Sequence, residues 1–246
     1  MEHKTILILG ASSDIGMKYI EYLKENEQNI TVIAHYRTLS EAFQELLTAC
    51  KDIKIVPLQA DLSVHEEVIQ LITKIHTHYL IPTHILFLPA PRFAYMKIAE
   101  YDDKKAKESM QIQIFSFQEI LKAFLPNMEK EHFGKIAVML TACIYGEPPK
   151  YMVDYIVSKY ALLGLIKAVA SEYGEKGINI NGISPNMVDT KFIKGMGRKV
   201  REIAAESNPR HRNLLPEDVI PAIDYLLSKK SDFMNGCTLN LSGKTN

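Results

Sequence analysis

Residues 5–16 of this 246-residue chain read TILILGASSDIG. The apolar run Thr5–Leu9 has the length and continuity of a buried strand, and a helical pattern begins at Ile15. Between them, Gly10 would allow a sharp turn, and Gly16 would allow the helix to pack closely on the strand. A glycine-bearing turn between strand and helix favours dinucleotide binding, because free N–H groups at the helix N-terminus face the phosphates. A tight turn without a ligand is the alternative.

The rest of the chain alternates short apolar runs with longer helical patterns. Six further strands are expected, at Ile30–His35, Ile53–Leu58, Thr83–Leu88, Lys135–Thr141, Ile178–Ser184 and Cys237–Leu241. Helices are expected at Ile15–Asn26, Leu39–Cys50, His65–Tyr79, Asp103–Met128, Val153–Tyr173 and Pro216–Leu227. This alternation predicts an α/β fold with a parallel sheet and helices on both faces. No linker or repeat divides the chain, so we expect residues 1–246 to form one domain.

Composition excludes several functional classes. The chain has 29 basic and 29 acidic residues, so no general attraction to nucleic acid or membranes is expected. Its three cysteines are far apart and show neither metal nor disulfide spacing, which suits a reducing compartment. We find no signal peptide and no apolar stretch long enough to span a bilayer, and therefore expect a cytoplasmic protein. His76 and His78 lack a third ligand, so no metal is expected.

The stretch Tyr155-Ile156-Val157-Ser158-Lys159 indicates acid–base chemistry. It lies in the predicted helix Val153–Tyr173, where residues four apart share one face. A free tyrosine has a pKa of about 10, and a neighbouring ammonium group favours the phenolate. Tyr155 and Lys159 are therefore a plausible general acid/base pair. Many helices carry this spacing by chance, so the pair gains weight only from the rest of the chain.

Several motifs together resemble the short-chain dehydrogenase/reductase family. The order and spacing match at Gly10 to Gly16, Asp61-Leu62, Tyr155-x-x-x-Lys159, Ser184-Pro185 and Asn235-Gly236-x-x-Leu239-x-Leu241-x-Gly243. The resemblance covers nearly the whole chain and is strongest to 3-oxoacyl-carrier-protein reductases. It implies a single-domain Rossmann fold with a seven-stranded parallel sheet, NAD(P) as hydride carrier, and a homodimer or homotetramer built on the Gln113 and Tyr155 helices.

The resemblance also assigns the cofactor contacts. They are Gly10, Ser12, Ser13, Asp14, Ile15, Gly16, Tyr36, Arg37, Asp61, Leu62, Ala90, Tyr155, Lys159, Pro185, Val188 and Thr190. Asp14 stands where the family has a glycine; its carboxylate would repel a phosphate, or it could cap the helix with its side chain turned away. Asp61 either hydrogen-bonds the adenine amino group or is the N-cap of the next helix.

Two further departures from the family bear on the cofactor. In NAD-preferring members of the family, an aspartate stands at the position that resembles Tyr36. Here that acid is absent and Arg37 follows, whose charged guanidinium fork suits a 2′-phosphate. NADP(H) is therefore predicted over NAD(H), and a solvated loop arginine is the alternative. The fourth strand ends Leu88-Pro89-Ala90-Pro91 where the family has Asn-Asn-Ala-Gly. Two prolines remove two N–H donors, so this loop must be built differently.

The family's catalytic residues map onto four positions. Thr141 takes the place of the serine, and Gln113 that of the asparagine, as an amide one methylene longer; a polar helix residue at an interface is the alternative for Gln113. Asn186 replaces a glycine, at a position where positive φ is expected. In the implied mechanism the nicotinamide gives hydride to a carbonyl carbon. Tyr155 gives the proton, Thr141 holds the oxygen, and Lys159 adjusts the pKa of Tyr155.

Residues 187–215, the predicted lid, are the part of the chain that closes over substrate in this family. Their segment 191–212 carries two acids, Glu202 and Glu206, and seven bases: Lys191, Lys194, Arg198, Lys199, Arg201, Arg210 and Arg212. This excess predicts a small anionic or acyl-carrier-linked carbonyl substrate, and a solvated basic face is the alternative. A catalytically impaired cofactor-binding scaffold or redox sensor is the competing function. A sugar-nucleotide epimerase is less favoured because little room is left for a substrate domain.

Overall fold

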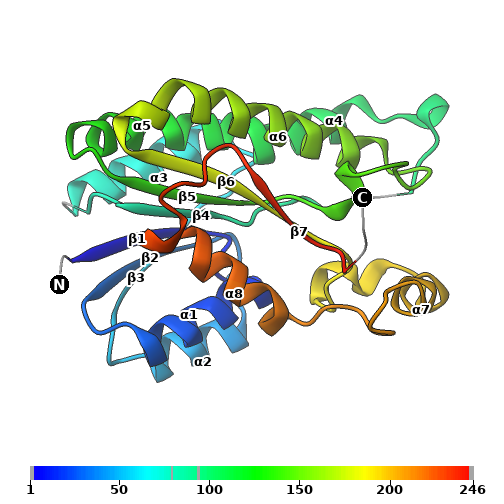
Figure 1. The fold of residues 1–246 in the computed structure, drawn as a ribbon, viewed down its shortest axis with the longest axis horizontal. Helices are drawn as coiled ribbons and strands as arrows, with labels where there is room; N and C mark the ends of the chain where they lie inside the picture. The colour runs from blue at the N-terminus through cyan, green and yellow to red at the C-terminus, as the bar shows by residue number, and fades with distance from the viewer. Residues whose placement is uncertain (1–2, 79, 93–94, 244–246) are drawn as a thin grey trace.

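The structure is a computed structural model that describes residues 3–78, 80–92 and 95–243. Its centre is a parallel sheet with the strand order β3-β2-β1-β4-β5-β6-β7 (Figure 1). The strands are β1 Lys4–Leu9, β2 Ile30–Tyr36, β3 Lys54–Gln59, β4 His84–Phe87, β5 Gly134–Met139, β6 Ile178–Pro185 and β7 Thr238–Leu241. The predicted Rossmann fold with seven parallel strands is confirmed.

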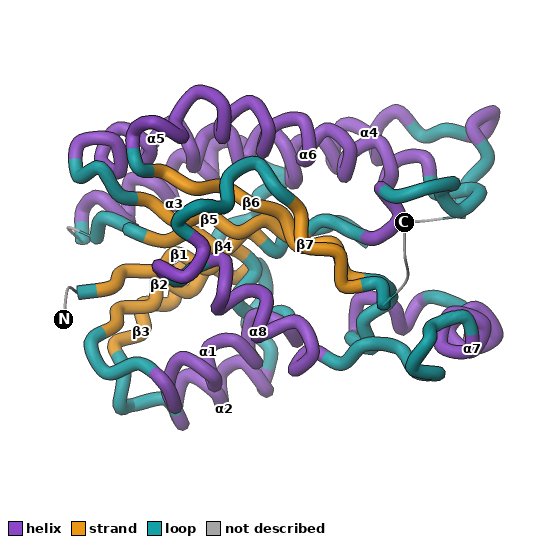
Figure 2. Tube along the Cα trace, viewed as in Figure 1, coloured by secondary structure: helices purple, strands orange, loops and turns teal. Residues whose placement is uncertain are grey.

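Helices cover both faces of the sheet, which explains why the strands are continuous apolar runs. One face carries α1 Asp14–Asn26, α2 Glu41–Ala49 and α8 Pro216–Leu226; the other carries α3 His65–Thr77, α4 Asp103–Met110, α5 Ser116–Lys130 and α6 Val153–Tyr173 (Figures 1 and 2). Alternate residues of β1 enter the two cores: Ile6 and Ile8 face α1, whereas Leu7 and Leu9 face the α5 side. Tyr79, the predicted end of α3, lies outside the described residues.

The long helix predicted at Asp103–Met128 is interrupted by one wider turn. Residues Gln111–Phe115 form a π-helical segment between α4 and α5. Three consecutive residues of this segment, Ile112, Gln113 and Ile114, are buried. Short π-helical segments within α-helices occur frequently at functional sites. Here the segment directs the side chain of Gln113 into the protein interior.

The predicted lid contains more regular structure than the sequence suggested. A 3₁₀ turn at Lys191–Gly195 is followed by helix α7 at Arg198–Glu206. A bridge between Val188 and Leu214 pairs the two ends of the segment. Helix α7 lies beyond the edge at which the strands end (Figure 1). Within the described ranges, no helix combines the length and apolarity needed to cross a bilayer.

Gly16 is expected to contribute to stability because the position has no room for a side chain. A Cβ at Gly16 would lie 2.7 Å from the carbonyl oxygens of Gly10 and Ala11. Gly16→Ala should lower the free energy of unfolding by about 1–3 kcal/mol, as overpacking does, and should weaken binding of the dinucleotide expected at this turn. Gly164→Ala is the control, because nothing lies within 4 Å of its added Cβ. Urea unfolding that shows equal effects for both variants would contradict the expectation.

Candidate active site

The candidate site lies where the order of the strands reverses. β1 and β4 are neighbours in the sheet. From this pair the strands follow in chain order toward both edges, β2 and β3 on one side and β5, β6 and β7 on the other. In open parallel sheets, ligands bind at the carboxyl ends of the strands at such a switch point. The glycine turn follows β1, residues 88–91 follow β4, Thr141 follows β5 closely, and Pro185 ends β6. The fold therefore brings four separate predicted motifs to one edge.

The glycine turn has the geometry expected from the sequence. Gly10 has a φ of +81°, in the left-handed region that favours glycine. Ser13 is the N-cap of α1, and its hydroxyl accepts the Gly16 N–H at 3.0 Å. The Ala11 N–H donates to the carbonyl of His35 at 2.8 Å and ties the turn to β2. Ser12 and Ile15 are half-buried beside it.

His35 is a residue of this site that the sequence analysis missed. Its Nδ1 accepts the Gly10 N–H at 3.1 Å, and its Nε2 donates to the Ala60 carbonyl at 3.0 Å. Acceptance of the Gly10 N–H at Nδ1 requires the neutral ring with its proton on Nε2, and burial lowers the pKa of His35 to about 4. The ring thus joins the first glycine to the residue before Asp61. A histidine inside an otherwise apolar strand is the signal that could have revealed it.

Asp61 caps a turn of its own and is not the N-cap of α3. Its Oδ1 accepts the Ser63 N–H at 2.9 Å and the Ser63 hydroxyl at 2.7 Å. Val64 occupies the N-cap position of α3, so the alternative of a helix cap is wrong. Burial raises the pKa of Asp61, but the bonds from Ser63 and the charge of Arg37 outweigh it and hold the pKa below its usual value. Asp61 is therefore ionised at neutral pH.

Tyr36 and Arg37 point in different directions at the end of β2. The Tyr36 ring packs on Phe43 of α2, with 5.5 Å between ring centroids. Arg37 is exposed, while its carbonyl accepts a hydrogen bond from the Gln59 side chain at 3.0 Å. Because its charge acts on Asp61, Arg37 belongs to the same end of the site. Leu62, next to Asp61, is buried.

The proline-containing loop after β4 begins against the glycine turn. The Leu88 N–H donates to the Leu9 carbonyl at 3.1 Å, so the last donor before the prolines extends the sheet. A Cβ on Gly10 would lie 3.4 Å from the Leu88 Cβ. Pro89, Ala90 and Pro91 are half-buried, and residues 93–94 lie outside the described ranges. The loop therefore packs on Gly10 without the N–H groups that the prolines remove.

The Asp14 side chain turns toward the predicted lid. Its Oδ2 accepts the backbone N–H of Lys191 at 2.6 Å, and its Oδ1 lies 3.9 Å from the Lys191 ammonium. The expectation that Asp14 caps its own helix is wrong, because Ser13 does so. That the side chain turns away from the cofactor phosphate stays a prediction, and its bond to Lys191 agrees with it.

The hydroxyl groups of Thr141 and Tyr155 meet at the ends of β5 and α6. Thr141 Oγ1 accepts the Cys143 N–H at 3.2 Å, so its own proton is available to the hydrogen bond with Tyr155. Tyr155 is half-buried, and the Phe192 ring lies 6.4 Å from it, centroid to centroid. The structure therefore brings together two hydroxyl donors from separate elements under the predicted lid. Phe192 is a second neighbour that the sequence analysis missed.

Lys159 lies beneath Tyr155 and is buried, with 1% of its surface exposed. Its Nζ donates to the Met139 carbonyl at 2.9 Å and lies 5.8 Å from the Tyr155 ring centroid. Burial lowers the pKa of Lys159 to about 7. Burial also raises the pKa of Tyr155 to about 12, and the bond from Thr141 offsets only part of this rise. The predicted lowering of the Tyr155 pKa by Lys159 is therefore wrong for this structure; Tyr155 is protonated at neutral pH.

Gln113 lies inside the protein and contacts α6. Its Nε2 donates to the Ser158 hydroxyl at 2.6 Å, and Ser109 lies 3.4 Å away. Ser158 in turn donates to the Tyr155 carbonyl at 3.0 Å. The Gln113 Oε1 is buried and has no hydrogen-bond partner among the described residues. Gln113 thus joins the π-helical segment to the helix that carries Tyr155 and Lys159.

The segment after β6 differs from its prediction at one position. Among the described residues other than glycine, φ is positive at His132, Tyr151 and His211, so the positive φ expected for Asn186 is wrong. Asn186 instead accepts the Met187 N–H on its own side chain at 2.9 Å. Pro185 and Val188 are buried, and the Thr190 hydroxyl donates to the Val188 carbonyl at 3.3 Å.

Among the described residues, no group of three or more histidine, cysteine, aspartate and glutamate side chains is arranged to hold a metal ion. His76 instead packs on the Phe124 ring, with centroids 5.2 Å apart. Cys50, Cys143 and Cys237 are free.

The family described as enoyl-(acyl carrier protein) reductase matches residues 10–243. The chain belongs to the short-chain dehydrogenase/reductase family. The oxidoreductase YmfI of Bacillus subtilis is 29% identical over 245 residues, which cover 98% of each chain. The 3-oxoacyl-[acyl-carrier-protein] reductase FabG of Rickettsia prowazekii is 25% identical over 98% of this chain and 95% of its own.

Solved structures show the same fold. A 3-oxoacyl-(acyl-carrier-protein) reductase of Agrobacterium tumefaciens with NADP bound has a TM-score of 0.87 at 20% identity, covering 98% of this chain and 94% of the other. A 4-hydroxyisoleucine dehydrogenase complexed with NADH has a TM-score of 0.87 at 24% identity, covering 98% of both. The predicted class, an NAD(P)-dependent short-chain dehydrogenase/reductase, is confirmed.

The neutral state of His35 predicts a loss of stability in acid. The unfolded chain takes up a proton near pH 6.5, whereas the folded protein does so only near pH 4. Stability is therefore complete above pH 6.5 and falls as pH drops toward 4, and His84, whose pKa is about 3, acts in the same direction. Between about pH 7.5 and pH 5, His35 should account for a loss of about 2 kcal/mol.

Urea unfolding of wild type and His35→Asn at the two pH values measures this contribution. The variant should be less stable at neutral pH, because it lacks the bridge, but should lose less stability in acid. An equal loss in both proteins would contradict the role of His35.

Proposed function

We propose that this protein reduces a ketone to an alcohol with NADPH, and that Tyr155 is the general acid. The observation that carries the proposal is the meeting of the Tyr155 and Thr141 hydroxyls, two donors that can converge on one carbonyl oxygen. The nicotinamide supplies the hydride. Tyr155, protonated at neutral pH, gives a proton to the oxygen while Thr141 holds it in place. Gln113 orders the helix that carries Tyr155.

The residues present fit a dinucleotide. The turn after β1 leaves the N-terminus of α1 open to the pyrophosphate. Gly16 has no side chain, and Ser13, whose hydroxyl caps the helix, has a small one. Ionised Asp61 can accept from the adenine amino group, and buried Leu62 packs beside it. We assign the nicotinamide end to Ala90, Pro185, Val188 and Thr190, and a contact with the nicotinamide ribose to Lys159.

NADP(H) is the proposed cofactor rather than NAD(H). The exposed Arg37 guanidinium stands at the end of β2, and the neighbouring Tyr36 ring is turned away onto Phe43. A 2′-phosphate would thus meet an arginine and no carboxylate at that position. NADP and NADH are each bound by one of the two similar structures, so these neighbours do not select between the two cofactors.

We propose a 3-oxoacyl thioester, carried by an acidic carrier protein or coenzyme A, as the substrate class. Three of the seven bases of the predicted lid are paired: Lys191 with Asp14, Arg198 with Glu202 at 2.6 Å, and Arg212 with Asp218 at 2.5 Å. Lys194, Lys199 and Arg210 are exposed and would attract an anion. The FabG relative, named as a 3-oxoacyl-[acyl-carrier-protein] reductase, supports this class.

Enoyl reduction is a second candidate, because the matching family is described as enoyl-(acyl carrier protein) reductase. It differs in the bond that receives the hydride, a C=C bond instead of a C=O bond. NADPH oxidation with an acetoacetyl thioester compared with a crotonyl thioester separates the two. The convergence of two hydroxyl donors favours the ketone.

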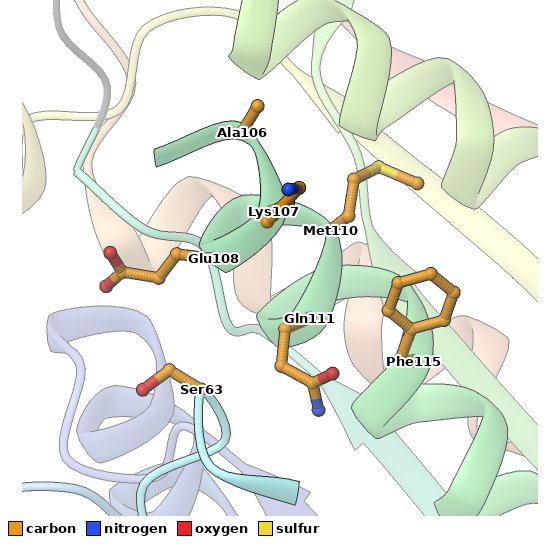
Figure 3. A pocket seen from close by; sticks show the side chains of 7 residues that line it. All are labelled: Ser63, Ala106, Lys107, Glu108, Met110, Gln111 and Phe115. Atoms are coloured by element: carbon orange, nitrogen blue, oxygen red, sulfur yellow. The ribbon is translucent and has the colours of Figure 1, made fainter. Parts of the chain in front are cut away.

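A homodimer or homotetramer is proposed through the outer face of α4, α5 and α6. Phe115 is 48% exposed, and Val157 and Tyr160 on α6 are exposed as well. Phe115 borders a hollow of about 500 Å³ that is lined by Ser63, Ala106, Lys107, Glu108, Met110, Gln111 and Phe115 (Figure 3). Apolar groups on a helix face favour burial against a partner. A cytoplasmic location stays a prediction.

Removing the Tyr155 hydroxyl tests the function. Tyr155→Phe should lower kcat for acetoacetyl-thioester reduction by about 10²- to 10⁴-fold, the range of a lost general acid. NADPH binding should persist in the variant. Tyr173→Phe, a hydroxyl loss at the far end of the same helix, should leave kcat unchanged. A wild-type protein that binds NADPH tightly but reduces no carbonyl would favour the scaffold or redox-sensor alternative.

Removing the Arg37 guanidinium tests the cofactor preference. Arg37→Ala should raise the dissociation constant for NADPH by about tenfold, as expected for a lost charged hydrogen bond. The dissociation constant for NADH should not change. Lys54→Ala, at the amino end of β3, is the control for loss of an exposed positive charge. Equal losses for both cofactors would contradict the preference.

A further inference from the structure

Asp14 connects two parts of the chain that lie 177 residues apart. It is the first residue of α1, and its carboxylate accepts the Lys191 N–H at 2.6 Å. The Lys191 ammonium, 3.9 Å from the other carboxylate oxygen, adds a weaker electrostatic contact. The Asp14 side chain is 20% exposed, whereas Lys191 is exposed, so the bond lies at the surface and its acceptor is the better-buried partner.

The Lys191 N–H needs an acceptor from outside its own segment. Lys191 opens the 3₁₀ turn Lys191–Gly195, and the first N–H groups of a helical turn have no acceptor within it. Thr190 occupies the N-cap position, but its side chain makes no capping bond and donates instead to the Val188 carbonyl. Asp14 therefore provides the cap that the local sequence does not.

The turn held in this way carries Phe192. The Phe192 ring lies 6.4 Å from the Tyr155 ring, inclined by 40°. Ile193 and Met196 are buried and anchor the other side of the turn. The place of the aromatic ring over Tyr155 therefore depends on where the turn begins, and Asp14 sets that point.

We propose that Asp14 is a positioning residue that holds the lid turn, and with it Phe192, over Tyr155. The proposal rests on the proposed function for the role of α1 in cofactor binding and of the lid in substrate binding. Asp14 then joins the phosphate end of the site to the substrate end, through its bond to Lys191. A glycine at this position, as in the family pattern, could not make the bond.

The lid turn can be monitored without substrate, because the chain contains no tryptophan. Phe192→Trp places a single tryptophan beside Tyr155, and acrylamide quenching of its fluorescence, excited selectively over that of the tyrosines, measures its exposure. Adding Asp14→Ala should raise the quenching constant at least about twofold, because the turn loses a hydrogen bond to a charged group. Asp14→Asn should have a smaller effect, since its amide oxygen can still accept the Lys191 N–H.

Two further variants make the test specific. Lys191→Pro removes the donor while leaving α1 unchanged, and proline is tolerated at the start of a helical turn. It should raise the quenching constant as Asp14→Ala does. Glu21→Ala is the matched control, because Glu21 is a carboxylate on the same helix that pairs with Lys18 at 3.2 Å. It should leave quenching unchanged.

Kinetics separate positioning from general damage. These kinetics use the protein that keeps its native Phe192. In it, Asp14→Ala should raise KM for an acetoacetyl thioester about tenfold, and the dissociation constant for NADPH should stay unchanged or fall. Unchanged quenching in both Asp14→Ala and Lys191→Pro would overturn the proposal, and so would a loss of NADPH binding as large as the rise in KM. If quenching rises but the wild type reduces no ketone, the positioning role stands and the proposed function fails.

Discussion

The burial of the Lys159 ammonium is the constraint on which the site depends. A lysine with 1% exposure needs an acceptor, and it finds the carbonyl of Met139, the last residue of β5. One turn earlier on α6, Tyr155 meets Thr141, and the intervening Ser158 accepts from Gln113. Three contacts within five residues therefore fix the rotation and height of α6 against the sheet and the π-helical segment.

Burial also explains the electrostatics of the pair. Low solvent exposure favours the neutral form of each group, so the pKa of Tyr155 rises to about 12 and that of Lys159 falls to about 7. A protonated phenol is the state that a proton donor for carbonyl reduction requires. Residue spacing predicts the proximity of tyrosine and lysine, but it carries no information on how much water each group loses. The error in the predicted pKa direction has this origin.

Much of the fold could be predicted, because parallel strands covered on both faces must be apolar along their whole length. The run Thr5–Leu9 supplies both cores, and its observed bounds, Lys4–Leu9, differ by one residue. The π-helical segment Gln111–Phe115 could not be predicted, since its apolar residues also fit an α-helix. Helix α7 was missed because its residues are mostly charged or exposed and lack a broad buried face.

The candidate site, like the fold, could be predicted only in part. Gly10, Gly16, Thr141, Tyr155 and Lys159 are local motifs, and the structure brings them to one edge of the sheet. Contacts between distant segments were not predictable: His35 joins Gly10 to Ala60, and Asp14 reaches Lys191. Asp14 stood out in the sequence as an acid at a phosphate turn, whereas His35, a polar group in a buried strand, was missed. In both cases the side chain makes a bond that no local pattern contains.

The most direct test of this account is a crystal structure with NADP⁺ bound. It should place the pyrophosphate at the N-terminus of α1 and the nicotinamide C4 facing the Tyr155 and Thr141 hydroxyls, with space for one carbonyl group between ring and hydroxyls. The Lys159 ammonium should contact the nicotinamide ribose. A nicotinamide ring held away from Tyr155, or a cleft filled by the side chains of the loop after β4, would contradict the proposed chemistry.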